Sequence, residues 1–553
     1  MCMTILIGSK ASAAGEVLVG HNEDAPGRFT MQTHLVHKKR RGSGKTRRFE
    51  PDTADIDLFT TRTNLFWSEA KNFSDAPSTS AFCDFYANGH GVVICSNNCA
   101  NSREDSPELL NGGIGYGLRR LVAERAYTAR EALSIACDLV DKYGYASSGR
   151  SYAFADKTEI YVMQIVHGKH YAIARVPDDE AAVIPNHYTI HEPDRKTRGY
   201  DELVAYAAKR GWYDPDDGAF DFAKAYQSPD SWGLSKNTYR HVKAFEILLD
   251  MDLSGLLEGE WQSLPFSIRP AHKVSIDTLK KILRSHGDNS NPHFSEPLTI
   301  CNTETLESTI AEIRYSPDRV ILRRALGRPC YSPYVVWYLG SGGIPEGYED
   351  KNGEVSLTEH FRTKPEDMDY RNNAWFRTME VQSCAEILRY DASERLKTAE
   401  NKIEAKVKML DPQIELRMSS NPVIARAMME AVLLYGVKAL GDSQQGMKND
   451  MKIIAGEAVN SVMPGGNFSV RISKIEGLDV SECRCGPSYR KYSDWSECVG
   501  ITEDGGYCVL EFSAGAGKWL DDAVPCFTDL YMLLTDTSGN RYAGSVKIKV
   551  RGV

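Results

Sequence analysis

The sequence predicts an α+β protein with a helical extension and a small all-β domain at its C-terminal end. In the first two thirds of the chain, short apolar strand segments surround amphipathic helical segments, which favours a layered arrangement. Residues 375–455 carry apolar residues at mostly helical spacing, and after Gly465-Gly466 the pattern changes to short strands separated by Gly, Asp and Ser. We therefore expect three parts, with bounds at 1–375, 376–456 and 457–553.

The first expected element is a β-hairpin that begins at residue 2. Apolar residues dominate from Cys2 to Gly8, small turn residues follow at 11–15, and residues 16–21 form a second strand rich in Val and Leu. With the tip near residue 13, the numbers of paired residues should sum to about 26. This register places Cys2 opposite the end of the second strand, close to Asn22–Asp24.

Further elements follow from the two-residue period of strands and the period of about 3.6 residues of helices. Short strands are expected at 58–62, 91–96, 151–154, 159–166 and 170–175. Two helices are expected at 117–126 and 129–143, and Thr128 is a suitable N-cap for the second. In the helical extension, Pro422 opens an amphipathic run to Leu440. The C-terminal domain should contain strands at 468–472, 507–512, 530–534 and 545–550.

Composition bounds the classes of function. The chain has 553 residues, of which 42% are hydrophobic and 25% are charged, as is typical of globular proteins. Its formal net charge of −9 argues against a protein whose main task is to neutralise phosphates, so we expect no nucleic-acid partner. No window of about 18 apolar residues occurs, and we expect no membrane partner.

The cysteines and the N-terminal residues favour a cytoplasmic protein. The first residues lead directly into an apolar strand pattern rather than into a basic and then apolar signal segment. The 13 cysteines include no Cys-x-x-Cys pair, which suits reduced thiols. Five of them fall in the last 75 residues, and for these a disulfide or a metal site remains an open alternative. Cys483-x-Cys485 alone is weak evidence for either.

Two patterns that could indicate a cofactor fail on spacing. The phosphate-binding loop Gly-x4-Gly-Lys-[Ser/Thr] would need glycine at position 39, where this chain has Lys39, so a solvated basic loop is the better interpretation. Four histidines, at positions 34, 37, 187 and 191, are not joined to a carboxylate at zinc-ligand spacing. We expect no cofactor and no metal.

Cys2 is chemically special because it follows the initiator Met1. An aminopeptidase can remove Met ahead of a small residue, which would leave Cys2 with a free α-amine. The thiolate is a strong nucleophile, and an α-amine with a pKa of about 7.7–8.0 can accept the thiol proton near neutral pH. One residue would then hold both the nucleophile and the base.

Several motifs resemble the cysteine dipeptidases among the N-terminal nucleophile (Ntn) hydrolases, which are related to bile salt hydrolase, penicillin V acylase and secernin. The opening resemblance is Cys2-Met-Thr-Ile-Leu-Ile-Gly followed by Gly20-His21-Asn22-Glu23-Asp24. It continues in Tyr86-Ala-Asn88-Gly-His-Gly91-Val, Arg125-Ala-Tyr-Thr-Ala-Arg130-Glu-Ala, Ala155-Asp156-Lys-Thr-Glu159, Arg175-Val-Pro-Asp178-Asp and Pro185-Asn186-His-Tyr. The resemblance is strong over 1–245, weakens beyond it and ends near residue 455.

The resemblance implies a four-layer αββα sandwich of the Ntn-hydrolase type for the first part of the chain. It also implies a set of site residues, in which Cys2 is the nucleophile, Asp24 hydrogen-bonds its α-amine, Asn88 is the oxyanion-hole asparagine, Asn186 is a second polar residue at the nucleophile and Arg240 is the site arginine of the bile salt hydrolase branch. His21 stands where these families usually carry Arg, and as a substrate-binding residue it supplies a titratable donor.

The implied reaction is amide hydrolysis of dipeptides or short peptides with a free N-terminus, through a thioester and without a cofactor. Polar and charged residues near the expected site, at Glu23, Arg28, Asp84 and 97–105, favour a charged peptide substrate. Two alternatives stay open: an amidase that acts on bile acid conjugates, acyl-amino acids or penicillins, and a non-catalytic protein similar to secernin that retains Met1. We expect a homo-oligomer, with the C-terminal domain mediating assembly or attachment.

Overall fold

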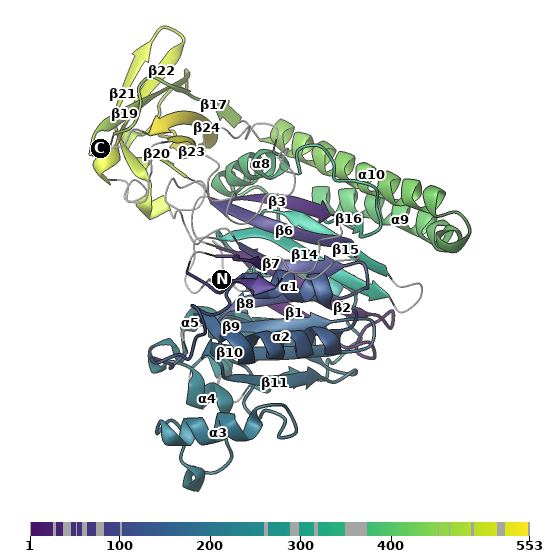
Figure 1. Ribbon diagram of the computed structural model, residues 1–553. Helices are drawn as coiled ribbons and strands as arrows, with labels where there is room; N and C mark the ends of the chain where they lie inside the picture. Colours follow the sequence, from purple (N-terminus) through teal and green to yellow (C-terminus); the bar gives the residue numbers. More distant parts are fainter. Residues whose placement is uncertain are drawn as a thin grey trace.

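Figure 1 shows the computed structural model of the chain. The structure describes residues 2–25, 29–36, 46–50, 52–57, 63–72, 82–99, 102–258, 264–287, 293, 298–314, 319–348, 373–451, 453–463, 465–487, 492–516 and 526–550. The strand expected at 58–62, the basic loop around Lys39 and the predicted site neighbour Arg28 lie outside these ranges.

A seven-stranded antiparallel sheet contains the N-terminal hairpin. Its strands, in spatial order, are β13 (Ser267–Ile268), β12 (Ala181–Ile184), β1 (Met3–Ile7), β2 (Val17–Asp24), β14 (Thr305–Arg314), β15 (Arg319–Leu326) and β16 (Val335–Tyr338). The hairpin is confirmed, and its register is one residue from the expected one: Met3 pairs with Asn22 and Ile7 with Leu18, so paired numbers sum to 25. Cys2 thus lies at the open end of the hairpin, beside the end of β2.

A second seven-stranded antiparallel sheet is formed by the segments between β2 and β12. Its order is β11 (Tyr171–Val176), β10 (Ile160–Gly168), β9 (Tyr145–Ala155), β8 (Val93–Asn98), β7 (Phe82–Asn88), β6 (Leu65–Asn72) and β3 (Phe29–Val36). A short separate ribbon joins β4 (Thr46–Arg47) to β5 (Ile56–Asp57). The strands expected at 91–96, 151–154, 159–166 and 170–175 are confirmed as β8 to β11; β9 begins six residues before its expected start, and the other bounds differ by one or two residues.

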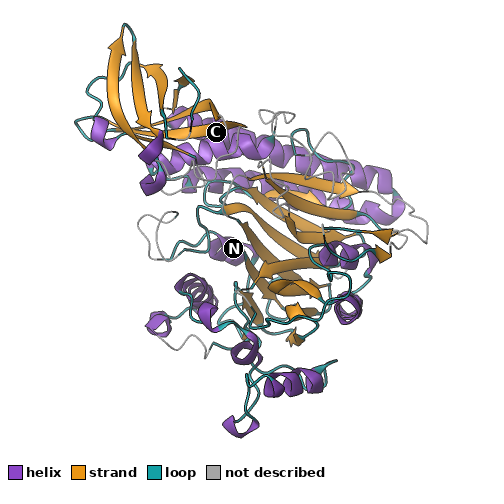
Figure 2. Ribbon diagram, turned by 60° about the vertical axis from the view of Figure 1, so that its left-hand side comes forward, coloured by secondary structure: helices purple, strands orange, loops and turns teal. Residues whose placement is uncertain are grey.

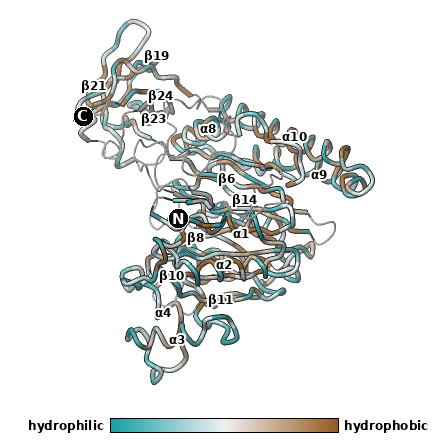
Figure 3. The backbone as a smooth tube through the Cα atoms, viewed as in Figure 1, coloured by the Kyte–Doolittle hydropathy of each residue, from teal (hydrophilic) through white to brown (hydrophobic). Residues whose placement is uncertain are grey.

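Alternation along the strands divides the apolar side chains between two cores. In β8, Val93 and Cys95 belong to a core shared with the first sheet, whereas Ile94 belongs to a core shared with helices α1 (Gly117–Arg125) and α2 (Ala129–Tyr143). Successive side chains point to opposite faces, so the second sheet is buried on both faces and reads as nearly continuous apolar segments. Figure 3 shows hydrophobic stretches in these strands and helices.

Helices also cover the outer face of the first sheet. α5 (Ser235–Leu249) and α6 (Ile276–Leu283) share a core with β1, β2, β12 and β14. The predicted helices α1 and α2 are confirmed, and the Thr128 side chain accepts a hydrogen bond from the Glu131 N–H as the expected N-cap. Two further helices, α3 (Tyr200–Lys209) and α4 (Phe222–Tyr226), lie beyond β11, at the end of the molecule opposite the C-terminal strands (Figure 1).

The segment after residue 373 is helical, as predicted. It comprises α8 (Ala374–Leu388), α9 (Ser393–Ser420) and α10 (Pro422–Asp450), the last beginning at the predicted proline. α9 and α10 lie side by side across β15 and β16, with a shared core that includes Ile321, Ile403 and Val432 (Figures 1 and 2). The two helices therefore cover the first sheet at its β16 edge.

The C-terminal residues form an eight-stranded sheet with its own apolar core. The order is β17 (Ile453–Ala455), β24 (Arg541–Val550), β23 (Cys526–Thr535), β20 (Arg484–Gly486), β21 (Ser496–Asp504), β22 (Tyr507–Ser513), β19 (Asn467–Ser473) and β18 (Glu457–Ala458). Cys483, Cys485, Cys498 and Cys508 lie in this part as buried free thiols. Within the residues described, no helix combines the length and the apolar character needed to cross a bilayer.

Candidate active site

The Cys2 thiol is buried among acidic groups at the open end of the hairpin. Its side chain is 3% exposed, and Sγ donates to Glu23 Oε1 at 3.2 Å. Asp84 Oδ2 lies 3.7 Å from the same sulfur and the carbonyl oxygen of Asp24 lies 3.9 Å away. Burial raises the pKa of the Cys2 thiol, and the carboxylate of Glu23 raises it further. The thiol is therefore protonated in this state, and a base must take its proton before it can attack a carbonyl carbon.

Glu23 is linked to the sequence-predicted residue His21. His21 Nε2 faces Glu23 Oε2 at 3.5 Å, and its Nδ1 lies 2.9 Å from the hydroxyl of Thr4. That hydroxyl donates its only proton to Asn97 Oδ1 at 2.6 Å, so it accepts a hydrogen bond from His21 Nδ1–H. His21 is fully buried behind Glu23, and it contacts the carboxylate partner of the thiol.

Asp84, at the start of β7, is held by two buried arginines. Arg119 Nη2 lies 2.6 Å from Oδ1, and Arg150 Nη1 donates to both carboxylate oxygens at 2.9 and 3.1 Å. Ser96 adds a hydroxyl hydrogen bond of 2.6 Å to Oδ1. Although burial opposes ionisation, the two guanidinium groups hold the pKa of Asp84 below its usual range. A fixed negative charge therefore stands beside the sulfur.

Asp24 is fully buried at the end of β2. Asn302 Nδ2 donates to Asp24 Oδ2 at 3.2 Å, and Arg240 Nη1 lies 3.7 Å from the same oxygen. Burial raises the pKa of Asp24 to about 6, and the charge of Arg240 limits the rise. The carboxylate is thus mostly ionised at neutral pH and lies close to the backbone of Cys2.

Arg240, on α5, connects the predicted residues to one another. Its Nη1 donates to the carbonyl oxygen of Cys2 at 3.2 Å, and its Nη2 donates to Asn186 Oδ1 at 2.6 Å. Asn237, one helical turn earlier, accepts a hydrogen bond of 2.9 Å from Nη2 and donates to the Asn186 carbonyl at 3.0 Å. Asn186 Nδ2 in turn donates to the carbonyl of Asn98 at the end of β8. The structure therefore brings together Cys2, Asp24, Asn186 and Arg240.

The structure does not bring Asn88 to this centre. Asn88 Nδ2 donates to the carbonyls of Ala123 and Ala126 at 2.9 and 2.8 Å, and Oδ1 accepts from two backbone N–H groups of the β7–β8 turn. Asp84 and Asn88 are four residues apart in one strand, which separates their Cα atoms by about 13 Å. The oxyanion role implied for Asn88 does not fit this geometry, because its amide groups hold the end of α1 against the turn.

Several residues of the centre were not singled out for a catalytic role by the sequence analysis. Glu23 and Asp84 were expected only as polar neighbours, although an aspartate inside an apolar strand is itself an indication of a buried ion pair. Asn302 carries no local signal, since it lies 278 residues from Asp24 in the chain. Long-range contacts of this kind come from the fold alone.

Cys2, His21 and Glu23 could also present ligand atoms to a metal ion, since one atom of each lies within 4.8 Å of the others. Hydrolysis by this arrangement does not require one, because a buried thiol with an adjacent base can form an acyl intermediate by itself. A buried thiol with a carboxylate on its sulfur is an arrangement that can carry out covalent hydrolysis.

Comparison with known proteins identifies the family. The profile of peptidase family C69 matches residues 1–364. A probable dipeptidase of Salmonella dublin is 26% identical over 367 residues, which are 61% of this chain and 81% of that protein. A probable dipeptidase of Latilactobacillus sakei is 25% identical over 390 residues, covering 64% and 78% of the two chains. This chain therefore belongs to peptidase family C69.

Among solved structures, the C2A mutant of the conjugated bile acid hydrolase from Clostridium perfringens aligns with a TM-score of 0.32 and 11% identity, over 59% of this chain and 89% of that chain. This similarity is too low to assign a substrate.

Proposed function

We propose that the protein is a cysteine dipeptidase in which Cys2 attacks the peptide carbonyl. The observation that carries the proposal is the Cys2 thiol, buried at a hairpin end with Glu23 on its sulfur and Arg240 on its carbonyl oxygen. The family match and the relatives named probable dipeptidases support the same reaction. The residue roles that follow are part of the proposal.

Removal of Met1 would supply the base. Met3 pairs with Asn22, so the α-amine of Cys2 would lie beside the end of β2, where Asp24 is placed. An α-amine with a pKa of about 7.7–8.0 is partly neutral at physiological pH and can take the thiol proton. Asp24 would then stabilise and orient the resulting ammonium group, and Arg240 and Asn302 would hold Asp24 in place.

The reaction has two halves. The sulfur forms a bond to the substrate carbonyl carbon, the tetrahedral intermediate collapses, and the C–N bond breaks as the ammonium group returns its proton to the departing amine. The α-amine then accepts a proton from water, whose oxygen attacks the thioester, and the C–S bond breaks to restore the thiol.

The charges around the sulfur favour a substrate with a free α-ammonium group. Glu23 places a carboxylate oxygen 3.2 Å from Sγ, so a cationic end of the substrate would find a partner there, whereas Asp84, 3.7 Å from Sγ, is already paired with Arg119 and Arg150. A pocket for a bile acid or a fatty acyl group would need apolar lining at the same place. The acidic surroundings thus support the dipeptidase over the amidase alternative.

We also propose that the first part of the chain is an Ntn-type αββα sandwich, because α1 and α2 pack on one sheet, α5 and α6 pack on the other, and an apolar core is shared by the two sheets. The bounds 1–375, 376–456 and 457–553, and homo-oligomer assembly through the C-terminal sheet, belong to the same proposal. The continuous packing of α8 with β24 and β23 supports attachment of that sheet to the helices.

The test combines intact mass with a substrate panel. The mass of the purified protein should correspond to a chain that starts at Cys2. Unblocked dipeptides should be hydrolysed at least about tenfold faster than their N-acetylated forms, since capping leaves a buried carboxylate without its partner. Faster turnover of an N-acetyl dipeptide, a glycine-conjugated bile acid or penicillin V would favour the amidase, and a retained Met1 without turnover would favour the non-catalytic protein.

A further inference from the structure

A cluster of two histidines and two cysteines lies between the first sheet and the helical extension. The His–Cys cluster consists of His286, His293, Cys301 and Cys330. The first three residues come from the connection between α6 and β14, and Cys330 comes from the turn between β15 and β16. Each residue offers one nitrogen or sulfur atom, and these four atoms all lie within 4.8 Å of one another.

The distances match the edges of a tetrahedral metal site. His286 Nε2 lies 3.1 Å from His293 Nε2, and the two sulfurs are 3.7 Å apart. His293 Nε2 lies 3.6 Å from Cys301 Sγ and 3.3 Å from Cys330 Sγ. Zinc bonds of about 2.3 Å to sulfur and about 2.0–2.1 Å to nitrogen place ligand atoms about 3.3–3.8 Å apart at tetrahedral angles. The two remaining distances, from His286 to the two sulfurs, lie within 4.8 Å, so a single zinc ion can be placed at the centre after adjustment of His286.

The surroundings of His293 are those of a zinc ligand. Its Nδ1 lies 2.8 Å from Glu386 Oε1 on α8, and Arg328 Nε lies 2.8 Å from the same oxygen. A carboxylate on one ring nitrogen fixes the tautomer and leaves the other nitrogen free to bind a metal. Here that other nitrogen, Nε2, is the atom that faces the two sulfurs.

The charge balance of the cluster also suits a buried zinc ion. When the two thiols release their protons to water, two thiolates neutralise the double charge of Zn²⁺, so the occupied site adds no net charge to the interior. The nearby carboxylate of Glu386 is balanced separately by Arg328. Two neutral imidazoles complete the four ligands.

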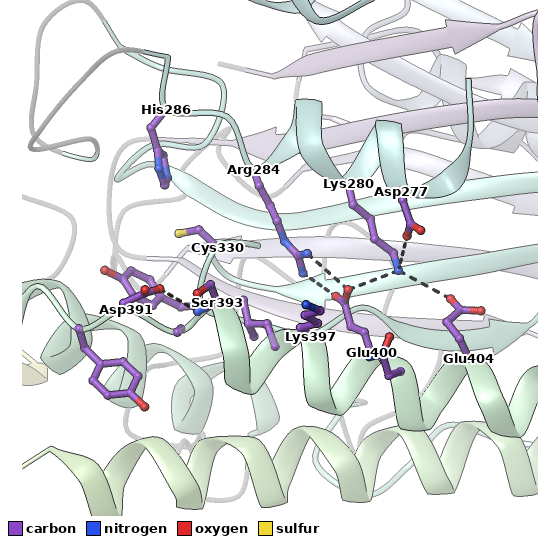
Figure 4. A pocket seen from close by; sticks show the side chains of 15 residues that line it. Asp277, Lys280, Arg284, His286, Cys330, Asp391, Ser393, Lys397, Glu400 and Glu404 are labelled. Atoms are coloured by element: carbon purple, nitrogen blue, oxygen red, sulfur yellow. Dashed lines mark hydrogen bonds and ion pairs between the residues drawn. The ribbon is translucent and has the colours of Figure 1, made fainter. Parts of the chain in front are cut away.

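The cluster has a path to solvent. His286 and Cys330 are half-buried and line one end of a pocket of about 660 Å³ between α6 and α9 (Figure 4). Ion pairs of Lys280 and Arg284 with Glu400 line the rest of it. A hydrated ion could enter from this side, while His293 and Cys301 lie on the buried side.

We propose that the His–Cys cluster binds one Zn²⁺ ion as a structural site. All four positions are filled by protein ligands, which leaves no open position for a substrate and is the arrangement of structural zinc. The ion joins two loops of the first sheet to each other and, through Glu386, to α8. This proposal departs from the expectation of no metal, because ligands spread from residue 286 to 330 meet only in the fold.

Zinc content of the full-length protein tests the proposal. Protein purified without chelator and reconstituted with equimolar Zn²⁺ should retain about one zinc per chain after exhaustive dialysis, as measured by mass spectrometry of the element. Replacement by Co²⁺ should give the intense d–d absorption of a tetrahedral site with thiolate-to-cobalt charge transfer. Cys330→Ser and His286→Gln should each lower the retained zinc at least about tenfold, in line with loss of one of four ligands.

Matched variants separate this site from general damage. Cys384→Ser removes a buried thiol of α8 outside the cluster, and His272→Gln removes an exposed imidazole, so both should keep about one zinc per chain. Wild-type protein that retains no zinc after reconstitution would overturn the proposal. A Cys301–Cys330 disulfide in protein alkylated at purification would overturn it too, since the bond would consume both sulfur ligands. None of these measurements depends on peptidase activity.

Discussion

The protein buries thiols in two contrasting surroundings. At Cys2 the closest polar groups are the carboxylates of Glu23 and Asp84. At Cys301 and Cys330 they are imidazole nitrogens and a second sulfur. Carboxylates disfavour a thiolate and keep the first thiol protonated until a base acts, whereas two thiolates with two imidazoles form a set that a soft metal ion stabilises. Burial acts on all three thiols, so the different roles that we propose for them follow from their different neighbours.

The largest effect expected is at Cys2. Cys2→Ala should abolish peptide hydrolysis, a loss of at least about 1000-fold in kcat, because it removes the sulfur that forms the thioester while the α-amine stays in place. It should leave the retained zinc and the melting temperature nearly unchanged, whereas Cys330→Ser should lower both. Steady-state assays and thermal unfolding of the two variants make the comparison, with Cys137→Ala on α2 as the control for a buried thiol. Equal loss of zinc in Cys2→Ala would break the distinction between the two regions.

A smaller effect is expected at Asp24, for which we propose the role of positioning the α-amine without contact with the substrate carbonyl. Asp24→Asn should lower kcat at least about tenfold with little loss of thermal stability. In the proposed mechanism, kcat of the wild type should fall as the α-amine is protonated below its pKa of about 7.7–8.0, and it should fall further as Asp24 is protonated near pH 6.

The contribution of Asp24 to stability changes with pH in the opposite direction to its contribution to kcat. A carboxyl whose pKa is raised by folding contributes stability below its unfolded pKa, and this contribution is lost as pH rises through about 6. Activity should therefore rise over the interval in which the Asp24 contribution to unfolding free energy falls. Chemical denaturation of wild type and Asp24→Asn between pH 4 and 7 measures the difference. If the free energies of unfolding of the two proteins change with pH in the same way, Asp24 is not the group with the raised pKa.

Asn302 should give a moderate effect, since it acts through Asp24. Asn302→Ala removes one hydrogen bond to the carboxylate, for which a loss of about 2–10-fold in kcat is expected. The acid limb of the pH profile should shift upward, because a carboxylate with fewer donors is protonated more readily. A purely structural role would lower the amount of folded protein without moving the pH profile.

The smallest effect on catalysis is expected at Asn88, a buried polar residue outside both regions. Asn88→Ala should leave kcat of the folded protein unchanged, because its amide binds only backbone groups of α1 and the β7–β8 turn. Loss of these bonds should lower the free energy of unfolding by about 1–3 kcal/mol. Denaturant titration and an activity assay on the same sample measure both; a tenfold fall in kcat at normal stability would return Asn88 to the catalytic site.

The sequence predicts the local elements well and the long-range partners poorly. The N-terminal hairpin, α1, α2 and the long helices follow from periodicity and capping, which depend on neighbouring residues. Asp24 could be predicted because the hairpin register places it near Cys2. The Asp84 ion pairs with Arg119 and Arg150 need strands and helices to be assembled first.

Asn88 illustrates the opposite case. Its motif resembles that of the family, but the side chain faces the end of α1, and the motif alone does not reveal which backbone groups an amide will find. The His–Cys cluster escaped prediction because its ligands do not follow the short spacing of zinc-binding motifs.

Cys301 and Asn302 are consecutive, so a ligand of the proposed zinc ion is joined by one peptide bond to the residue that donates to Asp24. Disturbance of the metal would reach the nucleophile through that bond. Chelators would then inhibit the peptidase, and thiol reagents would inhibit it by two routes, at Cys2 and at the ligand cysteines. In an inhibitor screen this enzyme would resemble a metallopeptidase and a cysteine peptidase at once, although no metal would touch its substrate.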